Sequence, residues 1–550
     1  MKKVLGILLA LIGLVVAAAG IAGIVVIGSD DTVDSPTTTL KLGEAKAVVS
    51  TPGLLAFKDT TMRLSARSTG GAVFIGQAHP VDAKSYLSTA PTYAVTKVDA
   101  SGMTGVVVKG DPKTVLADPT KQAFWTAKAT GPGTQSLTLK LDGSPTEYVV
   151  MPLGAGADVS VTSGVVVRNG FVLSIAAVVV GVLALVGGLL LTRRRKSSTP
   201  GPADAPAPGS AANSASAVVA DDAAPTSRTM SRVAALAVVG VVVPSLAGCG
   251  LVPTKVDAWK SEAVTKPALA GRAEAAAAMK DYDVRNNAAH AAVAKSFDLA
   301  PWEGVDSGVV LAGDRLDTRY AAMTKKWEGR AATTTVKDVF SSQWGAYPMY
   351  AFVSAQTQVK GDEPADVLLL MRRESASSPW LMDSKTWHES PLPTSDRAIA
   401  PLSKADHQLA MKAAGAAMTS LNGGRGGAAL PKEVSDYLAQ ERKREKGTAT
   451  ATAKADFFNT SRPDQLQPGG SVQAVRLDGG LMVQASYSVT SEQTTEPNWT
   501  LTLEDQKYAA VSYQVGPRTS IRSTMAVTLT MIVDPQGSIK VVGRGFQFII

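Results

Sequence analysis

The residue with the most specific chemistry is Cys249, the only cysteine among the 550 residues. Its thiol can form a thioether with a lipid, and it directly follows Leu246, Ala247 and Gly248. The small side chains of Ala247 and Gly248 let a protease approach the backbone just before the thiol. This order is typical of a bacterial lipobox. We therefore expect Cys249 to be lipidated and the three residues before it to form the recognition motif.

A short apolar run precedes this motif at residues 233–248, behind Arg228 and Arg232. At about 1.5 Å per helical residue the run reaches roughly 24 Å, which is less than the hydrocarbon core of about 30 Å. Pro244 interrupts a helix near its end. We expect residues 233–249 to be a lipoprotein signal segment. The alternative is a third, uncleaved membrane helix that ends in a small buried cysteine.

The remaining side chains show no catalytic or metal-binding spacing. The sequence contains no GxSxG elbow, Walker loop or SxxK motif, and one cysteine cannot build a thiolate site. No pair of histidines has the spacing of metal ligands. The histidines are His79, His290, His388 and His407. We therefore predict no catalytic residue, no cofactor and no metal, and expect a protein that is not an enzyme.

Ser403, Asp406 and His407 come nearest to a nucleophile arrangement. Because adjacent residues of a helix point about 100° apart, this segment cannot form a catalytic triad by itself. Tryptophans are concentrated after residue 250, where we expect most of them in the core. An aromatic groove for a glycan or a peptide is the alternative.

The net charge of +8 indicates membrane topology rather than a nucleic-acid surface. Residues 29–168 and 250–550 have nearly balanced charges, too little positive charge for a phosphate-binding surface. The excess cations flank apolar runs and are Lys2, Lys3, Arg193, Arg194, Arg195, Lys196, Arg228 and Arg232. Cations beside membrane helices stay on the cytoplasmic side, so these residues are expected to set the topology. For residues 193–196 a lipid-headgroup site is the alternative.

Two longer apolar runs, at residues 4–27 and 171–191, are predicted to span the membrane as helices. We expect the first to be retained, because no small-x-small site precedes the polar residues that follow it. A cleaved signal peptide is the alternative. The positive-inside rule places the N-terminus and residues 197–227 in the cytoplasm. Residues 197–227 are rich in Pro, Ala, Ser and Gly and lack hydrophobic periodicity, so we expect a disordered linker.

Residues 29–168, between these helices, are predicted to form an all-β sandwich outside the cytoplasm. Residues 137–142 alternate strictly between apolar and polar side chains. Further short β-branched runs lie between turn signals rich in Gly, Pro and Asp. Residues 81–87 fit a helical insert.

The region after the lipobox is predicted to contain two α+β modules, at residues 250–395 and 400–550. In each module helical patterns precede several strands, with helices at 267–297, 315–327, 403–421 and 431–446. The strands expected in the second module include residues 499–503 and 508–514. The repeated order indicates an internal duplication.

Two stretches resemble groups of actinobacterial proteins. Residues 1–196 are similar to uncharacterised two-helix membrane proteins, through Val73-Phe74-Ile75-Gly76, Phe124-Trp125 and Gly131-Pro132-Gly133. Residues 230–550 resemble uncharacterised lipoproteins with cystatin-like halves, through Tyr347-Pro348-Met349-Tyr350 and Ser378-Pro379-Trp380. The resemblances imply a β domain between two helices, followed by two halves in which a helix packs on a curved sheet. They imply no activity. Relatives of the second group often have arginine where Met349 stands here.

These patterns favour a non-enzymatic cell-envelope protein in the cytoplasmic membrane, with both folded regions on the extracytoplasmic side. We expect membrane-anchored modules that bind or assemble there with an envelope protein or ligand partner, and no nucleic acid. The alternative is a lipoprotein that binds a small ligand, lipid or glycan in support of transport or envelope biogenesis. The order of the regions also fits a fusion of two genes. Its product is either cleaved before Cys249 or kept as one three-span chain.

Overall fold

The computed structural model describes most of the chain, in two units. The described residues are 2–99, 101–154, 157–193, 254–256, 264–388, 391–393, 401–458 and 470–549. Unit 1 contains the described residues of 1–77, 91–112 and 127–258, and unit 2 those of 78–90, 113–126 and 259–550. The predicted linker at 197–227 and the lipobox segment at 233–249 lie outside the described residues.

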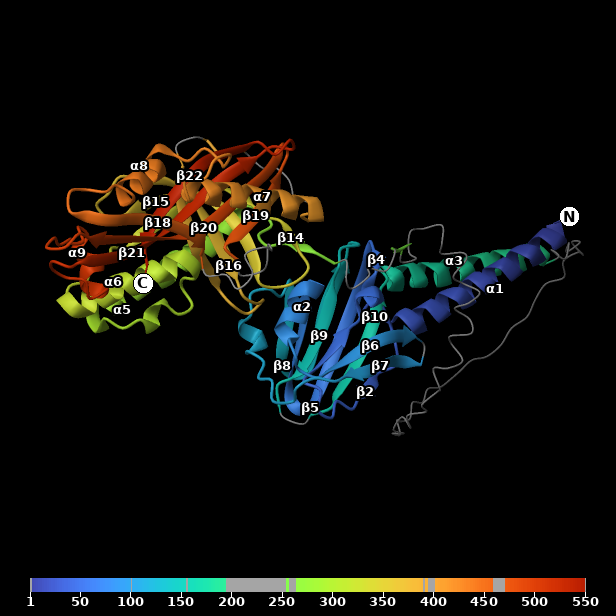
Figure 1. Cartoon of the computed structure of the whole chain (residues 1–550). Helices are drawn as coiled ribbons and strands as arrows, with labels where there is room; N and C mark the ends of the chain where they lie inside the picture. Colours follow the sequence, from blue (N-terminus) through green and yellow to red (C-terminus); the bar gives the residue numbers. More distant parts are fainter. Residues whose placement is uncertain are drawn as a thin grey trace, which may run out of the picture. The chain divides into compact units, whose positions relative to one another are not determined.

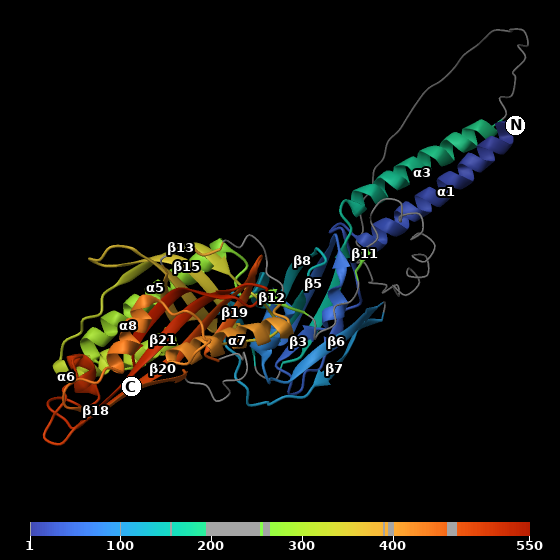
Figure 2. The same cartoon turned by 45° about the horizontal axis from the view of Figure 1, so that its top comes forward.

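Unit 1 contains two apolar helices, α1 (Lys2–Ile27) and α3 (Gly170–Thr192). Their mean hydropathies are 2.8 and 2.7, and both are long enough to cross a membrane, as the sequence predicts. The helices lie side by side (Figures 1 and 2). Glycines permit this approach, because a Cβ added to Gly13 would lie 2.6 Å from the carbonyl oxygen of Gly181.

The rest of unit 1 is built mainly from strands. They are β1 (Thr32–Asp34), β2 (Thr38–Leu40), β3 (Ala47–Ser50), β4 (Phe57–Lys58), β5 (Thr60–Ala78), β6 (Thr92–Asp99), β7 (Gly102–Val108), β8 (Ala127–Leu141), β9 (Glu147–Pro152), β10 (Val159–Val166) and β11 (Thr254–Lys255). Nine of them form one sheet in the order β1-β10-β5-β9-β3-β6-β7, with β2 beside β10 and β8 beside β5. Leu137, Leu139 and Leu141 of β8 are buried, whereas the residues between them are exposed. The predicted alternation and the β-rich character of this region are therefore confirmed.

The predicted helical insert is helix α2 (Pro80–Leu87), which belongs to unit 2 by its contacts. His79 precedes it, and the imidazole Nδ1 accepts a hydrogen bond of 3.3 Å from the Val81 N–H. Pro80 fits the first helical position because its missing N–H has no helical partner there.

Unit 2 repeats an order of helices followed by strands. Its first half contains β12 (Lys266–Pro267), α5 (Arg272–Ser296), α6 (Gly308–Thr324), β13 (Ala332–Phe340), β14 (Gln343–Trp344), β15 (Met349–Val359), β16 (Ala365–Arg373) and β17 (Trp380–His388). Its second half contains α7 (Lys404–Leu421), α8 (Lys432–Glu441), β18 (Thr448–Phe457), β19 (Val472–Leu477), β20 (Gly480–Thr495), α9 (Gln506–Val511), β21 (Ser520–Val533) and β22 (Ile539–Phe548). The predicted α+β character and the repeated order agree with this arrangement.

One curled nine-stranded sheet runs through both halves, in the order β13-β15-β16-β17-β22-β21-β20-β18 with β19 beside β20. Helix α5 covers one face of β15 and β16, where Val353 and Leu369 are buried. Their neighbours Phe352 and Leu368 point to the other face and pack against Met482 of β20. In Figure 1, α5 and α6 lie on one side of these strands and α7 and α8 on the other. Strands buried on both faces read as continuous apolar runs, as β16 does.

The prediction of a strand at 508–514 is wrong, because this segment begins as helix α9. The Asp505 carboxylate accepts a hydrogen bond of 2.7 Å from the Tyr508 N–H and so caps the helix. The segment predicted as a strand at 499–503 contributes only an isolated bridge, between Leu501 and Arg518.

Candidate functional site

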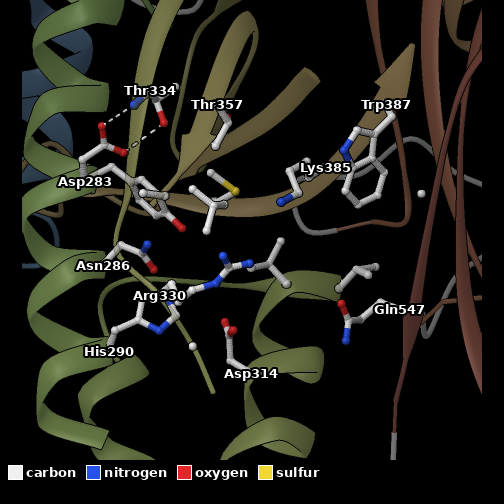
Figure 3. A pocket seen from close by; sticks show the side chains of 18 of the residues that line it. Asp283, Asn286, His290, Asp314, Arg330, Thr334, Thr357, Lys385, Trp387 and Gln547 are labelled. Atoms are coloured by element: carbon white, nitrogen blue, oxygen red, sulfur yellow. Dashed lines mark hydrogen bonds between the residues drawn. The ribbon is translucent and has the colours of Figure 1, made fainter. Parts of the chain in front are cut away.

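A cavity of about 340 Å³ in unit 2 is the strongest candidate for a functional site. It is bordered by α5, α6 and the strands β13, β15, β17, β21 and β22. Figure 3 shows its polar side chains, which come from both halves of the unit. Asp314 and Lys385 belong to the first half, and Gln547 belongs to the second.

A pair of buried carboxyl groups reaches the cavity through Asp314, which is a lining residue. Asp306 is 3% exposed, and its Oδ1 accepts a hydrogen bond of 2.8 Å from the Tyr282 hydroxyl. The carboxyl groups of Asp306 and Asp314 are hydrogen-bonded to each other. Such a bond requires a proton on one of the two groups. The Oδ2 atoms of both residues are buried, and no third group of the described chain donates a hydrogen bond to them.

Burial favours the protonated form of both carboxyl groups, and the charge of Asp306 further favours protonation of Asp314. Burial raises the pKa of Asp306 to about 6. Burial also raises the pKa of Asp314 well above its usual value, and the neighbouring Asp306 raises it further. The pair therefore holds one proton between its two carboxyl groups near neutral pH and has a charge of about −1.

The backbone holds Asp306 firmly in place. It lies between Trp302 and α6, where the Ser307 N–H donates to the Met382 carbonyl at 2.8 Å. The Trp302 indole N–H donates to the Thr318 hydroxyl at 2.9 Å, which ties the preceding turn to α6. The carboxyl pair is therefore positioned by a strand contact on one side and by helix packing on the other.

Lys385 reaches the cavity because β17 contains a bulge. The register between β16 and β17 skips Asp383, and an extra residue moves all later side chains to the opposite face. Lys385 and Trp387 consequently line the cavity together with Met382, although alternation would place them on the other face. Ser384 points the other way and donates a hydrogen bond to the second half of the unit.

The Lys385 ammonium group is partly buried and has no hydrogen bond or ion pair within the described chain. Its Nζ lies over the Trp387 ring, 5.0 Å from the centroid. Burial lowers the pKa of Lys385, whereas the charges of Asp314 and Asp306 raise it. The cavity therefore presents a cation at one place and a proton-sharing acid pair at another.

Among the histidines, His290 alone lines this cavity, and the sequence did not predict this position for it. Its ring lies 5.1 Å from that of Trp302 and 5.6 Å from that of Trp327. Burial lowers the pKa of His290, so the ring is neutral at pH 7. Its Nδ1 is buried without a partner in the described chain.

The nucleophile arrangement considered from the sequence is a helix cap. The Ser403 hydroxyl accepts a hydrogen bond of 3.1 Å from the Asp406 N–H, and Asp406 accepts one of 2.7 Å from the Ser403 N–H. Asp406 also forms an ion pair with Arg476. His407 takes no part in this capping box.

The residues predicted for lipidation and topology fall mostly outside the described chain. Those outside are Cys249, Leu246, Ala247, Gly248, Arg194, Arg195, Lys196, Arg228 and Arg232. Lys2 and Lys3 belong to α1, and Arg193 directly follows α3.

Sequence reasoning missed Asp306, Asp314 and Lys385. For Asp314 the sequence offers one indication of burial, because this residue directly follows Gly313, which is buried in α6. No signal in the sequence announced the bulge that turns Lys385 toward the cavity. Comparisons with protein-family models, with curated proteins and with solved structures found no match.

Proposed function

We propose that the protein is a non-enzymatic, membrane-anchored binding protein of the cell envelope, and that unit 2 binds a small polar ligand in its cavity. The volume of about 340 Å³ suits a small molecule. The observation that carries the proposal is the carboxyl group of Asp314, which lines the cavity and whose buried Oδ2 accepts no hydrogen bond from a third group of the described chain. Buried polar atoms without partners are costly, so a ligand that satisfies them gains affinity.

The arrangement supports binding better than hydrolysis. Enzymes that use two carboxyl groups keep both within reach of the substrate. Here Asp306 is 3% exposed and does not line the cavity, so only Asp314 can contact a ligand. One protonated acid pair beside an ammonium group is suited to recognising charge and hydrogen-bonding groups.

A cavity-filling variant tests this proposal. Asn286 lines the cavity from α5, and Ala288 lies two residues later on the same helix and is exposed. Full-length protein in detergent is screened with small polar molecules by thermal shift. Hits should stabilise the wild type and the Ala288→Trp control, and should fail to stabilise Asn286→Trp. Hits that stabilise all three proteins equally would exclude this cavity as the binding site.

The membrane anchor forms the second part of the proposal. The charge pattern and the two apolar helices support a chain whose two folded units lie outside the cytoplasm, with the second unit as a lipoprotein of cystatin-like halves. Native membranes treated with and without a lipoprotein signal-peptidase inhibitor distinguish the possible products. A C-terminal fragment that begins at acylated Cys249 supports cleavage. A single full-length species under both conditions supports a third membrane helix.

Assembly with another protein is a second candidate function, because β7 ends the sheet of unit 1 with an apolar stretch. Val106, Val107 and Val108 are 56%, 55% and 46% exposed. An edge strand of this kind is a template for strand pairing. Val107→Lys should reduce co-purifying partners after cross-linking, with Val115→Lys as a control at an exposed valine outside the strand.

A further inference from the structure

Most charged groups that line the cavity already have partners. Asp283 accepts hydrogen bonds from the Thr334 N–H at 2.7 Å and from its hydroxyl at 3.0 Å. Two further ion pairs hold lining residues, Arg330 with Asp362 at 2.6 Å and Glu328 with Lys326 at 3.5 Å. Lys385 and Asp314 remain as the charged lining groups that can act on a ligand in the described chain.

Lys385 has hydrogen-bond donors that the described chain does not use. An ammonium group has three donors, and this one meets only the face of Trp387. Lys385 forms no ion pair with a carboxylate of the described chain. A carboxylate on the ligand would satisfy it with charge-assisted hydrogen bonds.

The acid pair suits a protonated amine. With its shared proton the pair has a charge of about −1. If both carboxyl groups are ionised and one ammonium ion is bound, the net charge of pair and ion together is also about −1. An amine that donates to Asp314 can therefore take the place of the shared proton without changing the net charge. Its N–H groups would donate to the Asp314 Oδ2, which accepts no hydrogen bond from a third group of the described chain.

We infer that the ligand is a small zwitterion of the amino-acid type, whose carboxylate binds Lys385 and whose ammonium group binds the Asp314 carboxyl group. This inference rests on the proposed function of the cavity. The neutral polar groups nearby suit a polar side chain on the ligand, since the Thr357 hydroxyl is buried without a partner and Asn286 also lines the cavity.

Titration calorimetry on the full-length protein in detergent tests the inference. The probes are L-serine, L-glutamine and L-glutamate, each compared with its N-acetyl form and its carboxamide form. A dipeptide, L-alanyl-L-alanine, distinguishes a free amino acid from the end of a peptide. The free zwitterions should bind, and blocking either charged group should weaken binding about ten- to hundredfold.

Two variants assign the ends of the ligand. Lys385→Met should weaken the zwitterion to the level of its carboxamide and leave the affinity for the carboxamide unchanged. Asp314→Asn should abolish the preference for the free amine over the N-acetyl form. Lys385→Arg keeps the charge and serves as the control for folding, and its binding should stay closest to that of the wild type.

The outcomes separate this inference from the proposed function. If no zwitterion binds, but another molecule binds and is excluded by Asn286→Trp, the cavity has a function and the zwitterion inference is wrong. If zwitterions bind with equal affinity after blocking, or bind Lys385→Met as tightly as wild type, the inference is also wrong. If no small polar molecule binds at all, both proposals fail.

Discussion

Replacing Asp314 by asparagine should remove a pH dependence of stability that the carboxyl pair imposes on unit 2. In the folded protein burial raises the pKa of Asp306 from 3.8 to about 6. The folded state therefore binds its proton more tightly than the unfolded state. The pair's contribution to stability is fully present below about pH 4 and is lost as the pH rises through about 6.

The size of this effect follows from the pKa. A rise of roughly two units corresponds to about 3 kcal/mol at 1.36 kcal/mol per unit. In Asp314→Asn the new amide can still donate to the Asp306 carboxylate, so the contribution of Asp306 remains, whereas the raised pKa of Asp314 is removed. The free energy of unfolding of the variant, relative to that of the wild type, should therefore increase between pH 4 and pH 7.

Urea unfolding followed by tryptophan fluorescence measures this difference, because the tryptophans of the described chain belong to unit 2. The pKa values of His79 and His290 are lowered by burial, but these residues are present in both proteins and their contributions cancel. Asp298→Asn, in an exposed loop, is the control and should follow the wild type. If the free energy of unfolding depends on pH in the same way in Asp314→Asn and in the wild type, the proton-sharing pair is refuted.

Three further perturbations test other parts of the chain. Cys249→Ala should abolish acyl labelling and leave the folding of residues 250–550 intact, and unchanged labelling would contradict the lipobox. Gly181→Leu should separate α1 from α3, because a Cβ there would already lie 2.4 Å from the Ala17 nitrogen. Thermal unfolding in detergent should show the lower stability of this variant. Gly187→Leu is the control, because nothing lies within 4 Å of a Cβ at that position. Ser403→Ala should cost about 1 kcal/mol of unfolding free energy by removing the cap of α7, and a loss of ligand binding instead would assign that serine a functional role.

The sequence predicted those elements whose signal is local. Apolar length predicted α1 and α3, and strict alternation predicted the buried leucines of β8. Tyr508 shows the limit of such reasoning, because its apolar neighbourhood suggested a strand while a single capping aspartate directs the chain into α9. Short segments with mixed signals are decided by such side-chain to backbone hydrogen bonds.

The candidate site could not be predicted in the same way, because its parts are brought together by long-range geometry. Asp306 and Tyr282 meet only when α5 and the turn before α6 pack together. Lys385 faces the cavity only because Asp383 is an extra residue in the ladder. Alternation along β17 would have placed its ammonium group among the buried residues between the two halves, where a charge has no partner.

The cavity is a consequence of the way the two halves of unit 2 join. The strands β17 and β22 pair only at Trp387 with Arg544 and at His388 with Gly543. Beyond this short ladder helix α6 lies close to β22, because Gly313 has no Cβ to meet the Gln547 side chain, whose Cδ would be 2.3 Å away. The first half supplies both charged groups, and the second half supplies part of the wall. Neither half lines the cavity alone, so the site depends on both halves of unit 2.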